Sequence, residues 1–228
     1  MTAGAPVRGL LVDIDDTLYD YVAAEKIARA AVLEAVATSL AISQADASNH
    51  WDTARRAVKA RLGERASAHS RLLYLADLIH VAARPDALPL VRGWESLFWD
   101  ALLGAATLRR GALELVSSFR ANGGRVAVVT DLTLEIQLRK LERFGLLSHV
   151  DVVVASEEVP WDKPAPELFR LALERLSLDA SECLMVGDSA KKDGGGATAL
   201  GLRYFQIRST ENQSGGTFET LAEELRPR

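Results

Sequence analysis

The chain has 228 residues, of which 48% are hydrophobic and 25% are charged, and its formal net charge is −4. This composition is typical of a globular protein with a packed core, and it excludes a disordered or fibrous chain. Because nucleic-acid binding needs a basic face that neutralises phosphates, the net negative charge predicts no nucleic-acid partner. The composition does not indicate an oligomeric state.

The N-terminal residues, MTAGAPVRG, lack the apolar core of a signal peptide. No run of about 18 uninterrupted apolar residues occurs in the sequence. We therefore expect no membrane partner and a cytoplasmic location. Cys183 is the only cysteine, which excludes an internal disulfide and a thiolate metal cluster. Its place in the apolar stretch CLMVG predicts a packed thiol.

The first predicted element is a strand at residues 7–14, an apolar run without period-2 alternation. Such runs are typical of strands that are covered on both faces, as in a parallel sheet. Residues 18–104 have a different pattern, with no convincing strand and with helices expected at 22–40, 47–62, 66–82 and 91–103. We therefore predict a helical insertion inside an α/β domain, with hinges at 17–21 and 104–111.

Strands and helices alternate in the rest of the chain. The strands are expected at 125–129, 150–155, 183–186 and 202–207, and the helices at 134–144, 166–176 and 217–225. This order is the βαβ pattern of a doubly wound, Rossmann-like parallel sheet. Residues 1–17 and 105–228 are predicted to form this α/β core, with a polar surface loop at 209–216.

Polar residues follow several predicted strands at their carboxyl ends. They are Asp13 and Asp15 after the first strand, Thr130 and Asp131 after the second, and Asp188 after LMVG. In open α/β sheets ligands bind beyond the carboxyl ends of the strands, so we expect these side chains to converge. Neighbouring carboxylates repel one another, and a shielded one resists ionising unless a cation compensates. The stretch LLVDIDDTLYD therefore predicts positive charge nearby.

A calcium loop is a poor match to the same stretch. Asp13, Asp15 and Thr17 have the spacing of its first ligands, but Leu18 stands where a glycine is required. The twelfth position is Ala24 instead of glutamate, and the preceding element is a predicted strand rather than a helix.

Nucleotide-binding loops also fit poorly. Gly194, Gly196 and Ala199 match the dinucleotide pattern G-x-G-x-x-A, but they begin several residues beyond their strand and near the end of the sequence. No G-x-x-x-x-G-K-[ST] occurs, which excludes a P-loop nucleoside triphosphatase.

Four motifs, in their order and spacing, resemble those of the haloacid dehalogenase superfamily of phosphohydrolases: DIDDT, VVT, DKPAPELF and GDSAKKD. The resemblance spans residues 7–204, and the helical insertion at 18–104 resembles the C1-type cap of subfamily I. It implies a Mg2+-dependent phosphatase that hydrolyses a small phosphorylated metabolite of the nucleotide or sugar phosphate class. The reaction would pass through an aspartyl-phosphate intermediate.

The resemblance implies roles for the aspartates of the first and fourth motifs. Asp13 would be the nucleophile that attacks phosphorus. Asp15 would protonate the leaving oxygen and then take a proton from the attacking water. Mg2+ would be bound by Asp13, the backbone carbonyl of Asp15, and Asp188.

The remaining motif residues are expected to bind and stabilise the phosphoryl group. Thr130 would supply a hydroxyl, and Asp131, which stands where many relatives have asparagine, would supply its backbone N–H. Lys163 would stabilise the charge on the transferred group, and Asp193 would orient Lys163 or a metal-bound water. Because glycines at 194–196 are unfavourable near a helix start, a mobile loop is expected around Asp193.

Other functions remain open from the sequence. Dehalogenation is disfavoured, because related dehalogenases typically lack the second aspartate, here Asp15, and need no Mg2+. A phosphomutase would keep all four motifs, and its cap would decide the reaction. A catalytically idle phospholigand-binding protein would normally have lost a nucleophile or a metal ligand, and none is missing here.

Two features of the insertion have both a packing and a ligand-binding interpretation. Trp94, Phe98 and Trp99 have the spacing of one helix face, which favours core packing but would also allow stacking on a base or sugar. Basic residues gather at positions 55–71, either as a solvated face or as an anion-facing surface. Trp161, two residues before Lys163, has the same two interpretations as the aromatic stripe.

Overall fold

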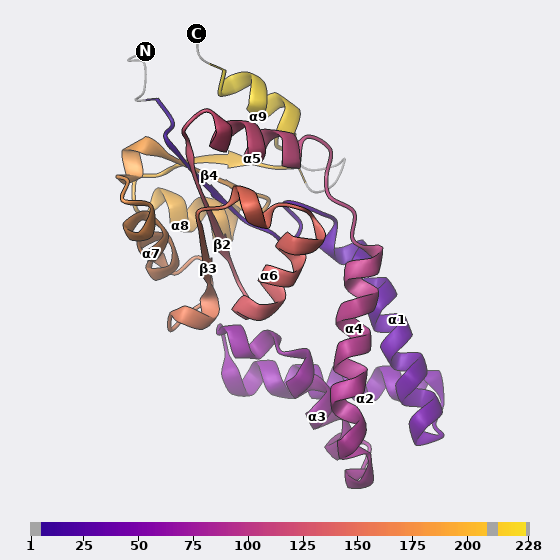
Figure 1. Cartoon of the computed structure of the whole chain (residues 1–228). Coiled ribbons are helices and arrows are strands. Elements are labelled where there is room, and N and C mark those ends of the chain that lie inside the picture. Colours follow the sequence, from indigo (N-terminus) through magenta and orange to yellow (C-terminus); the bar gives the residue numbers. More distant parts are fainter. Residues whose placement is uncertain (1–5, 209–213, 227–228) are drawn as a thin grey trace. The chain divides into compact units, whose positions relative to one another are not determined.

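A five-stranded parallel sheet, in the order β3-β2-β1-β4-β5, is formed in the computed structural model, which describes residues 6–208 and 214–226 (Figure 1). The strands are β1 (Gly9–Val12), β2 (Arg125–Thr130), β3 (Val152–Ala155), β4 (Cys183–Gly187) and β5 (Arg203–Gln206). This topology confirms the predicted doubly wound sheet. The strand order reverses between β1 and β4, so the ligand crevice of such a fold is expected beyond these two strands.

The chain divides into two compact units. The first comprises Met1–Asp20 and Thr107–Arg228 and contains the sheet, and we call it the core unit. The second, Tyr21–Ala106, is the cap unit. Residues 209–213 of the polar loop expected at 209–216 lie outside the described residues.

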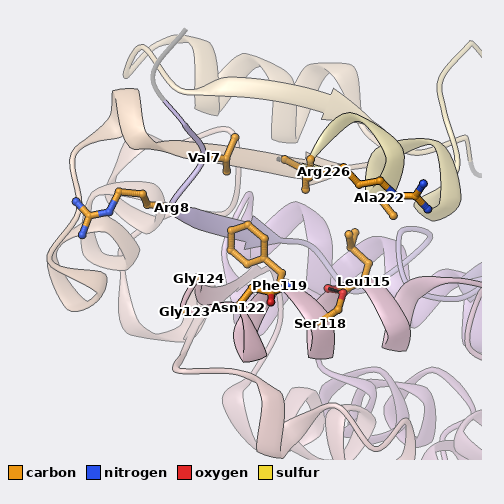
Figure 2. A pocket seen from close by; sticks show the side chains of 11 residues that line it. Val7, Arg8, Leu115, Ser118, Phe119, Asn122, Gly123, Gly124, Ala222 and Arg226 are labelled. Atoms are coloured by element: carbon orange, nitrogen blue, oxygen red, sulfur yellow. Dashed lines mark hydrogen bonds between the residues drawn. The ribbon is translucent and has the colours of Figure 1, made fainter. Parts of the chain in front are cut away.

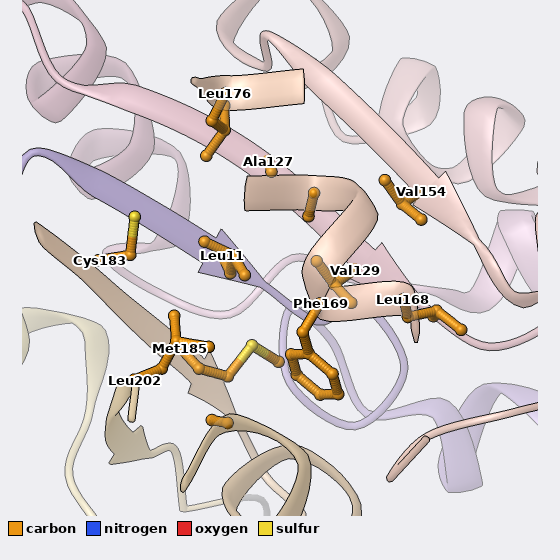
Figure 3. Close-up of a cluster of buried hydrophobic side chains, with 12 residues drawn as sticks. Leu11, Ala127, Val129, Val154, Leu168, Phe169, Leu176, Cys183, Met185 and Leu202 are labelled. Atoms are coloured by element: carbon orange, nitrogen blue, oxygen red, sulfur yellow. The ribbon is translucent and has the colours of Figure 1, made fainter. Parts of the chain in front are cut away.

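The central strands β1, β2 and β4 are buried on both faces of the sheet in the core unit. Its helices are α5 (Ala112–Ala121), α6 (Leu134–Arg143), α7 (Pro166–Leu176), α8 (Gly195–Thr198) and α9 (Phe218–Glu224). Leu11, Val129 and Met185 from three strands pack with Phe169 of α7 in one apolar cluster (Figure 3). Cys183 belongs to this cluster, and burial raises the pKa of its thiol to about 11, as expected of a packed thiol.

Four α-helices form the cap unit, all of whose residues are described: α1 (Tyr21–Leu40), α2 (Gln44–Leu62), α3 (Arg71–Val81) and α4 (Val91–Ala105). The helix expected at 66–82 is divided in the structure. Ala66–His69 forms a short 3-10 helix, and Ser70 then begins α3 by accepting the backbone N–H of Leu73 at 3.2 Å. A serine at this position satisfies an amide that the first helical turn leaves without a partner.

The aromatic stripe of α4 is core packing. Trp94, Phe98 and Trp99 are at most 5% exposed. Phe98 stacks on Trp51 of α2 with a centroid distance of 5.9 Å, and it meets Trp99 edge-to-face at 5.0 Å. Offset and edge-to-face pairs are favourable aromatic geometries, so these rings hold the cap helices together.

Most of the basic segment at 55–71 is exposed, in keeping with a solvated face. Arg71 is the buried exception, and its guanidinium donates to the carbonyl of His69 at 2.5 Å and to the Tyr21 hydroxyl. The guanidinium also lies over three rings at centroid distances of 5.1 to 5.6 Å, those of Tyr74, Phe98 and Trp99. Cation–π contacts stabilise a cation that is taken out of water, so Arg71 is part of the cap core.

No single helix within the described residues is both long and apolar enough to cross a membrane. The bent pair α1 and α2 passes that test together, by length and composition only, with an angle of 111° at the break.

Candidate active site

The turn after β1 brings the first motif back toward the sheet. Asp13 continues the pairing with β4, because its N–H donates to the carbonyl of Val186 at 3.0 Å. Asp16 then has a φ of 62°, a left-handed conformation that aspartate tolerates better than most residues. The reversal is closed by the N–H of Leu18, which donates to the carbonyl of Ile14 at 2.8 Å.

Thr17 links the two strand ends on either side of the point where the strand order reverses. Its hydroxyl lies 3.0 Å from Asp13 Oδ2 and 3.3 Å from Asp188 Oδ1. It also accepts the backbone N–H of Asp188 at 3.0 Å. Thr17 is fully buried, so this local turn residue holds together two aspartates that are far apart in the sequence.

Lys163 meets two buried carboxylates. Its Nζ lies 2.6 Å from Asp13 Oδ1 and 2.7 Å from Asp193 Oδ1, and it also donates to the carbonyl of Val129 at 3.2 Å. The second oxygen of Asp193 accepts the backbone N–H of Ser189 at 3.0 Å. The third and fourth motifs thus meet the first at one ammonium group.

Negative charge exceeds positive charge in this cluster. Burial raises the pKa of Asp13, and Asp193 raises it further, although Lys163 opposes both effects. Burial also raises the pKa of Asp188 to about 6, with repulsion from Asp193 and Asp16 adding to it. For Lys163, burial lowers the pKa, but the neighbouring aspartates outweigh burial and keep the ammonium charged.

The same carboxylates fit a hard cation. Asp13, Asp188 and Asp193 can each offer one oxygen, and these oxygens lie within 4.8 Å of one another. Carboxylate oxygens are the ligands that Mg2+ prefers, and the excess negative charge supplies the driving force for binding a cation. Both oxygens of Asp13 and both oxygens of Asp193 accept hydrogen bonds from protein groups, so these bonds do not rank the three aspartates as metal ligands.

Asp131 turns its side chain toward the third and fourth motifs. Its Oδ1 accepts a hydrogen bond from the backbone N–H of Lys163 at 2.9 Å, and its Oδ2 accepts one from the ammonium of Lys192 at 2.7 Å. The Thr130 hydroxyl donates to the Asp131 carbonyl at 3.2 Å and accepts Nε2 of Gln137 at 2.8 Å. The Asp131 carboxylate therefore links the segments that contain Lys163 and Lys192 by hydrogen bonds.

Asp15 is bound by residues that none of the four motifs contains. The Nζ of Lys140 lies 2.6 Å from its Oδ1 and 2.8 Å from its Oδ2. The Tyr19 hydroxyl donates to Oδ1 at 2.5 Å, and Nε2 of Gln137 lies 3.5 Å from Oδ2. Burial raises the pKa of Asp15, but these donors, Lys140 foremost, hold it below its ordinary value.

Sequence reasoning missed Lys140 and Gln137, although a signal was present. Both lie on α6 beside Ile136 and Leu141, which form the buried face of that helix. A lysine or glutamine at an apolar position of an amphipathic helix predicts a buried polar group that needs a partner. The pattern cannot name that partner, which is 125 residues away in the case of Lys140.

Packing requires two of the three glycines after Asp193, Gly194 and Gly196. Where the sequence suggested a mobile loop, the structure has a helical segment, a π-helix at Ala190–Gly194 that continues into α8. A Cβ on Gly194 would lie 2.9 Å from the Tyr204 ring, and one on Gly196 would lie 2.2 Å from the Phe169 ring. Gly187, at the end of β4, leaves room for Asp193, whose Oδ2 would lie 2.3 Å from an added Cβ. Small residues here allow Asp193 to approach Lys163.

A cavity of about 770 Å³ elsewhere in the core unit contains none of these residues. It lies between α5 and α9 beside the start of β1, and Phe119, Asn122, Ala222 and Arg226 are among its lining (Figure 2). The candidate active site is the cluster of motif side chains around Lys163, at the ends of β1, β2 and β4.

The chain is similar to known phosphatases over most of its length. Ribulose-1,5-bisphosphate 5-phosphatase from Halopiger xanaduensis is 38% identical over 233 residues, covering 94% of this chain and 96% of that protein. Glyceraldehyde 3-phosphate phosphatase from Methanocaldococcus jannaschii is 27% identical over 202 residues, covering 88% of this chain and 85% of that protein. In fold, the chain is similar to a 2-haloacid dehalogenase from Pseudomonas syringae, with a TM-score of 0.75, 22% identity, and coverage of 96% and 98% of the two chains.

A family model agrees with the motifs and the fold. The model for haloacid dehalogenase-like hydrolases matches residues 7–201, which include every motif residue discussed above. The chain therefore belongs to the haloacid dehalogenase-like hydrolase family.

Proposed function

We propose that this hydrolase is a Mg2+-dependent phosphatase acting on a small phosphorylated metabolite, with Asp13 as its nucleophile. The observation that carries the proposal is the contact of Lys163 with Asp13 at 2.6 Å, inside a cluster of buried and half-buried carboxylates that fits a hard cation. A lysine in that position can neutralise charge on a phosphoryl group that approaches Asp13.

The first half-reaction transfers the phosphoryl group to the enzyme. A carboxylate oxygen of Asp13 forms a bond to phosphorus while the bond from phosphorus to the leaving oxygen breaks. Because its donors lower the pKa of Asp15, this carboxylate must first take up a proton from solvent when the substrate binds. Asp15 then gives that proton to the leaving oxygen, which departs as an alcohol. Mg2+, held by Asp13, Asp188 and the backbone carbonyl of Asp15, would offset the repulsion between carboxylate and phosphate.

The second half-reaction restores Asp13. Asp15, now a carboxylate, takes a proton from a water molecule whose oxygen attacks phosphorus, and the bond between Asp13 and phosphorus breaks. Thr130 and the backbone N–H of Asp131 bind phosphate oxygens in both steps. Asp193 orients Lys163, a role supported by their contact of 2.7 Å.

Of the two substrate classes expected from the sequence, we favour the sugar phosphates. The two relatives described above, which match over most of the chain, carry the names of phosphatases for ribulose-1,5-bisphosphate and glyceraldehyde 3-phosphate, both phosphorylated sugars. We also propose that the cap unit is a C1-type cap that contacts the leaving group, as lids of this kind do. The cytoplasmic location stays a prediction.

Release of inorganic phosphate from a panel of phosphomonoesters tests the proposal. The panel includes sugar phosphates, nucleotides and p-nitrophenyl phosphate, each measured with Mg2+ and with EDTA. We expect hydrolysis with Mg2+ and none with EDTA or in Asp13→Asn. Glu142→Gln, which removes an exposed carboxyl of α6, is the matched control and should keep wild-type activity.

Two outcomes would contradict the proposal. Hydrolysis that persists in Asp13→Asn would remove that residue as the nucleophile. A folded wild type that binds Mg2+ but releases no phosphate from any compound would leave a phosphomutase or a binding protein as the function.

A further inference from the structure

Lys140 is a fully buried lysine whose charge is directed at the proposed acid and base. Its side chain is 0% exposed, and it comes from α6, outside the four motifs. A lysine that is removed from water loses its hydration, which is unfavourable unless a charged partner with good geometry compensates. Asp15 is that partner, at 2.6 and 2.8 Å from Nζ.

The contacts fix the Asp15 carboxylate through both of its oxygens. Lys140 spans Oδ1 and Oδ2, the Tyr19 hydroxyl adds a second donor to Oδ1, and Gln137 approaches Oδ2 at 3.5 Å. A carboxylate with one donor can rotate about its last bond, whereas one held at both oxygens keeps a single plane. The arrangement determines where Asp15 points.

Gln137 connects this group of donors to the phosphate end of the site. Its Nε2 also donates to the Thr130 hydroxyl at 2.8 Å and to the Asp131 carbonyl at 2.7 Å. Asp15 is thus held relative to the loop after β2. Fixing a catalytic group against the substrate-binding loop is how neighbouring residues contribute to proton transfer.

We propose that Lys140 is a positioning residue, which aims the Asp15 carboxyl group at the oxygen that accepts or gives the proton. This inference rests on the proposed function, because it assumes that Asp15 transfers protons. Lys140 contacts the Asp15 carboxylate and takes no bond-making or proton-transfer step of its own in the proposed reaction. Its loss should therefore impair proton transfer to the leaving oxygen while leaving substrate binding unchanged.

The leaving group gives a readout that a merely structural role would not change. An alkyl oxygen needs a proton as it departs, whereas p-nitrophenolate departs without one. For Lys140→Met we expect kcat to fall about 10 to 100-fold for the alkyl phosphate that the wild type hydrolyses fastest. For p-nitrophenyl phosphate we expect a fall of less than about threefold, with KM unchanged for both substrates.

Control variants distinguish the loss of the contact between Lys140 and Asp15 from the loss of a positive charge on α6. Arg139→Met removes the neighbouring cation of α6, whose side chain is 33% exposed and lies 3.8 Å from Glu135, and it should behave as the wild type. Lys140→Arg keeps a cation and should retain more alkyl phosphatase activity than Lys140→Met. If Lys140→Met does not fold, Tyr19→Phe can replace it, because this variant also removes one donor to Asp15. We expect kcat to depend on the leaving group in the same way, with a smaller fall.

A double-mutant cycle with Asp15→Asn tests whether Lys140 acts through Asp15. If it does, Lys140→Met causes no further loss in the Asp15→Asn background. Full additivity of the two losses would overturn the proposal, as would an equal fall of kcat for alkyl and aryl substrates. A wild type without activity on either ester would instead refute the proposed function, so the two failures are distinguishable.

Discussion

The ammonium of Lys163 lies 2.6 Å from Oδ1 of Asp13, although 150 residues separate the two in the sequence. This contact joins the end of β1 to the loop that precedes α7, and the two side chains are only 3% and 7% exposed. A buried ion pair of this kind is costly to form and more costly to break on one side only. It therefore connects the proposed chemistry to the stability of the core unit.

Replacing Lys163 by methionine should destabilise the protein strongly. Asp13 and Asp193 would remain buried without their cation, and breaking one side of a buried pair costs about 3–5 kcal/mol. The free energy of unfolding in urea measures this loss. Arg8→Met is the control, because the Arg8 side chain of the Arg8–Glu182 pair is 63% exposed, and such pairs contribute less than about 1 kcal/mol. Equal losses in the two variants would contradict the burial argument.

Stability without metal should fall as the pH rises. The pKa of Asp188 is raised to about 6, and that of Asp13 is raised as well, so the folded state keeps protons that the unfolded state releases. A carboxyl group whose pKa is higher in the folded state than in the unfolded state stabilises the fold at low pH. This stabilisation is lost as the pH rises from the pKa of the unfolded state to that of the folded state. Because Mg2+ binds the ionised carboxylates, its stabilising effect should grow over the same range.

Thermal unfolding with EDTA and with Mg2+, on both sides of the pKa of Asp188, checks this prediction. Asp188→Asn should show a smaller fall of melting temperature with pH in EDTA and little or no increase with Mg2+. A Mg2+ effect that is the same at every pH would show that the metal does not compete with protons in this cluster.

The two neighbouring glycines Gly196 and Gly195 should respond to alanine in opposite directions. A Cβ on Gly196 would lie 2.2 Å from the Phe169 ring, and overpacking of a core typically costs about 1–3 kcal/mol. Gly195 has helical dihedral angles, and a Cβ there would meet Pro164 at 3.9 Å and the Ala190 carbonyl oxygen at 4.0 Å, both ordinary contact distances. Gly195→Ala should therefore stabilise the protein, by about 0.4–1 kcal/mol.

Chemical denaturation of the two variants provides the comparison. A Gly194→Ile variant extends it, because its side chain would meet the Tyr204 ring, 2.9 Å from the Cβ position. If Gly194→Ile kept both stability and activity, the turn after Asp193 would be mobile, as the sequence suggested, rather than packed.

Asp131→Asn should have little effect on turnover. The side chain faces Lys192 and the backbone N–H of Lys163 rather than a phosphate, so removing its charge relieves no repulsion with substrate. We expect the loss of stability to stay below about 1 kcal/mol, because Lys192 is 43% exposed. Lys192→Met in the same background should add no further loss. A several-fold increase in kcat would mean that the carboxylate does face the phosphate.

Much of the fold follows from short-range features of the sequence. Apolar runs without alternation at β1, β2 and β4 mark strands that are covered on both faces, and strands of that kind pair in parallel. Because parallel strands present their carboxyl ends at one edge, the positions of Asp13 and Asp188 just beyond two of them implied one site. The roles given to the motif residues stay predictions.

Packing between distant segments determined the rest. In the sequence, Lys140 and Gln137 are polar residues on an apolar helix face. Only the packing of α6 in the core unit brings Asp15 to them as a partner. Arg71 belonged to a run of basic residues, and its burial over three rings depends on how α3 and α4 pack. A sequence determines which interactions each side chain can make through its periodicity and chemistry. Which of them form depends on tertiary contacts, because the cost of burying a charge is met by whichever partner the fold brings within hydrogen-bonding distance.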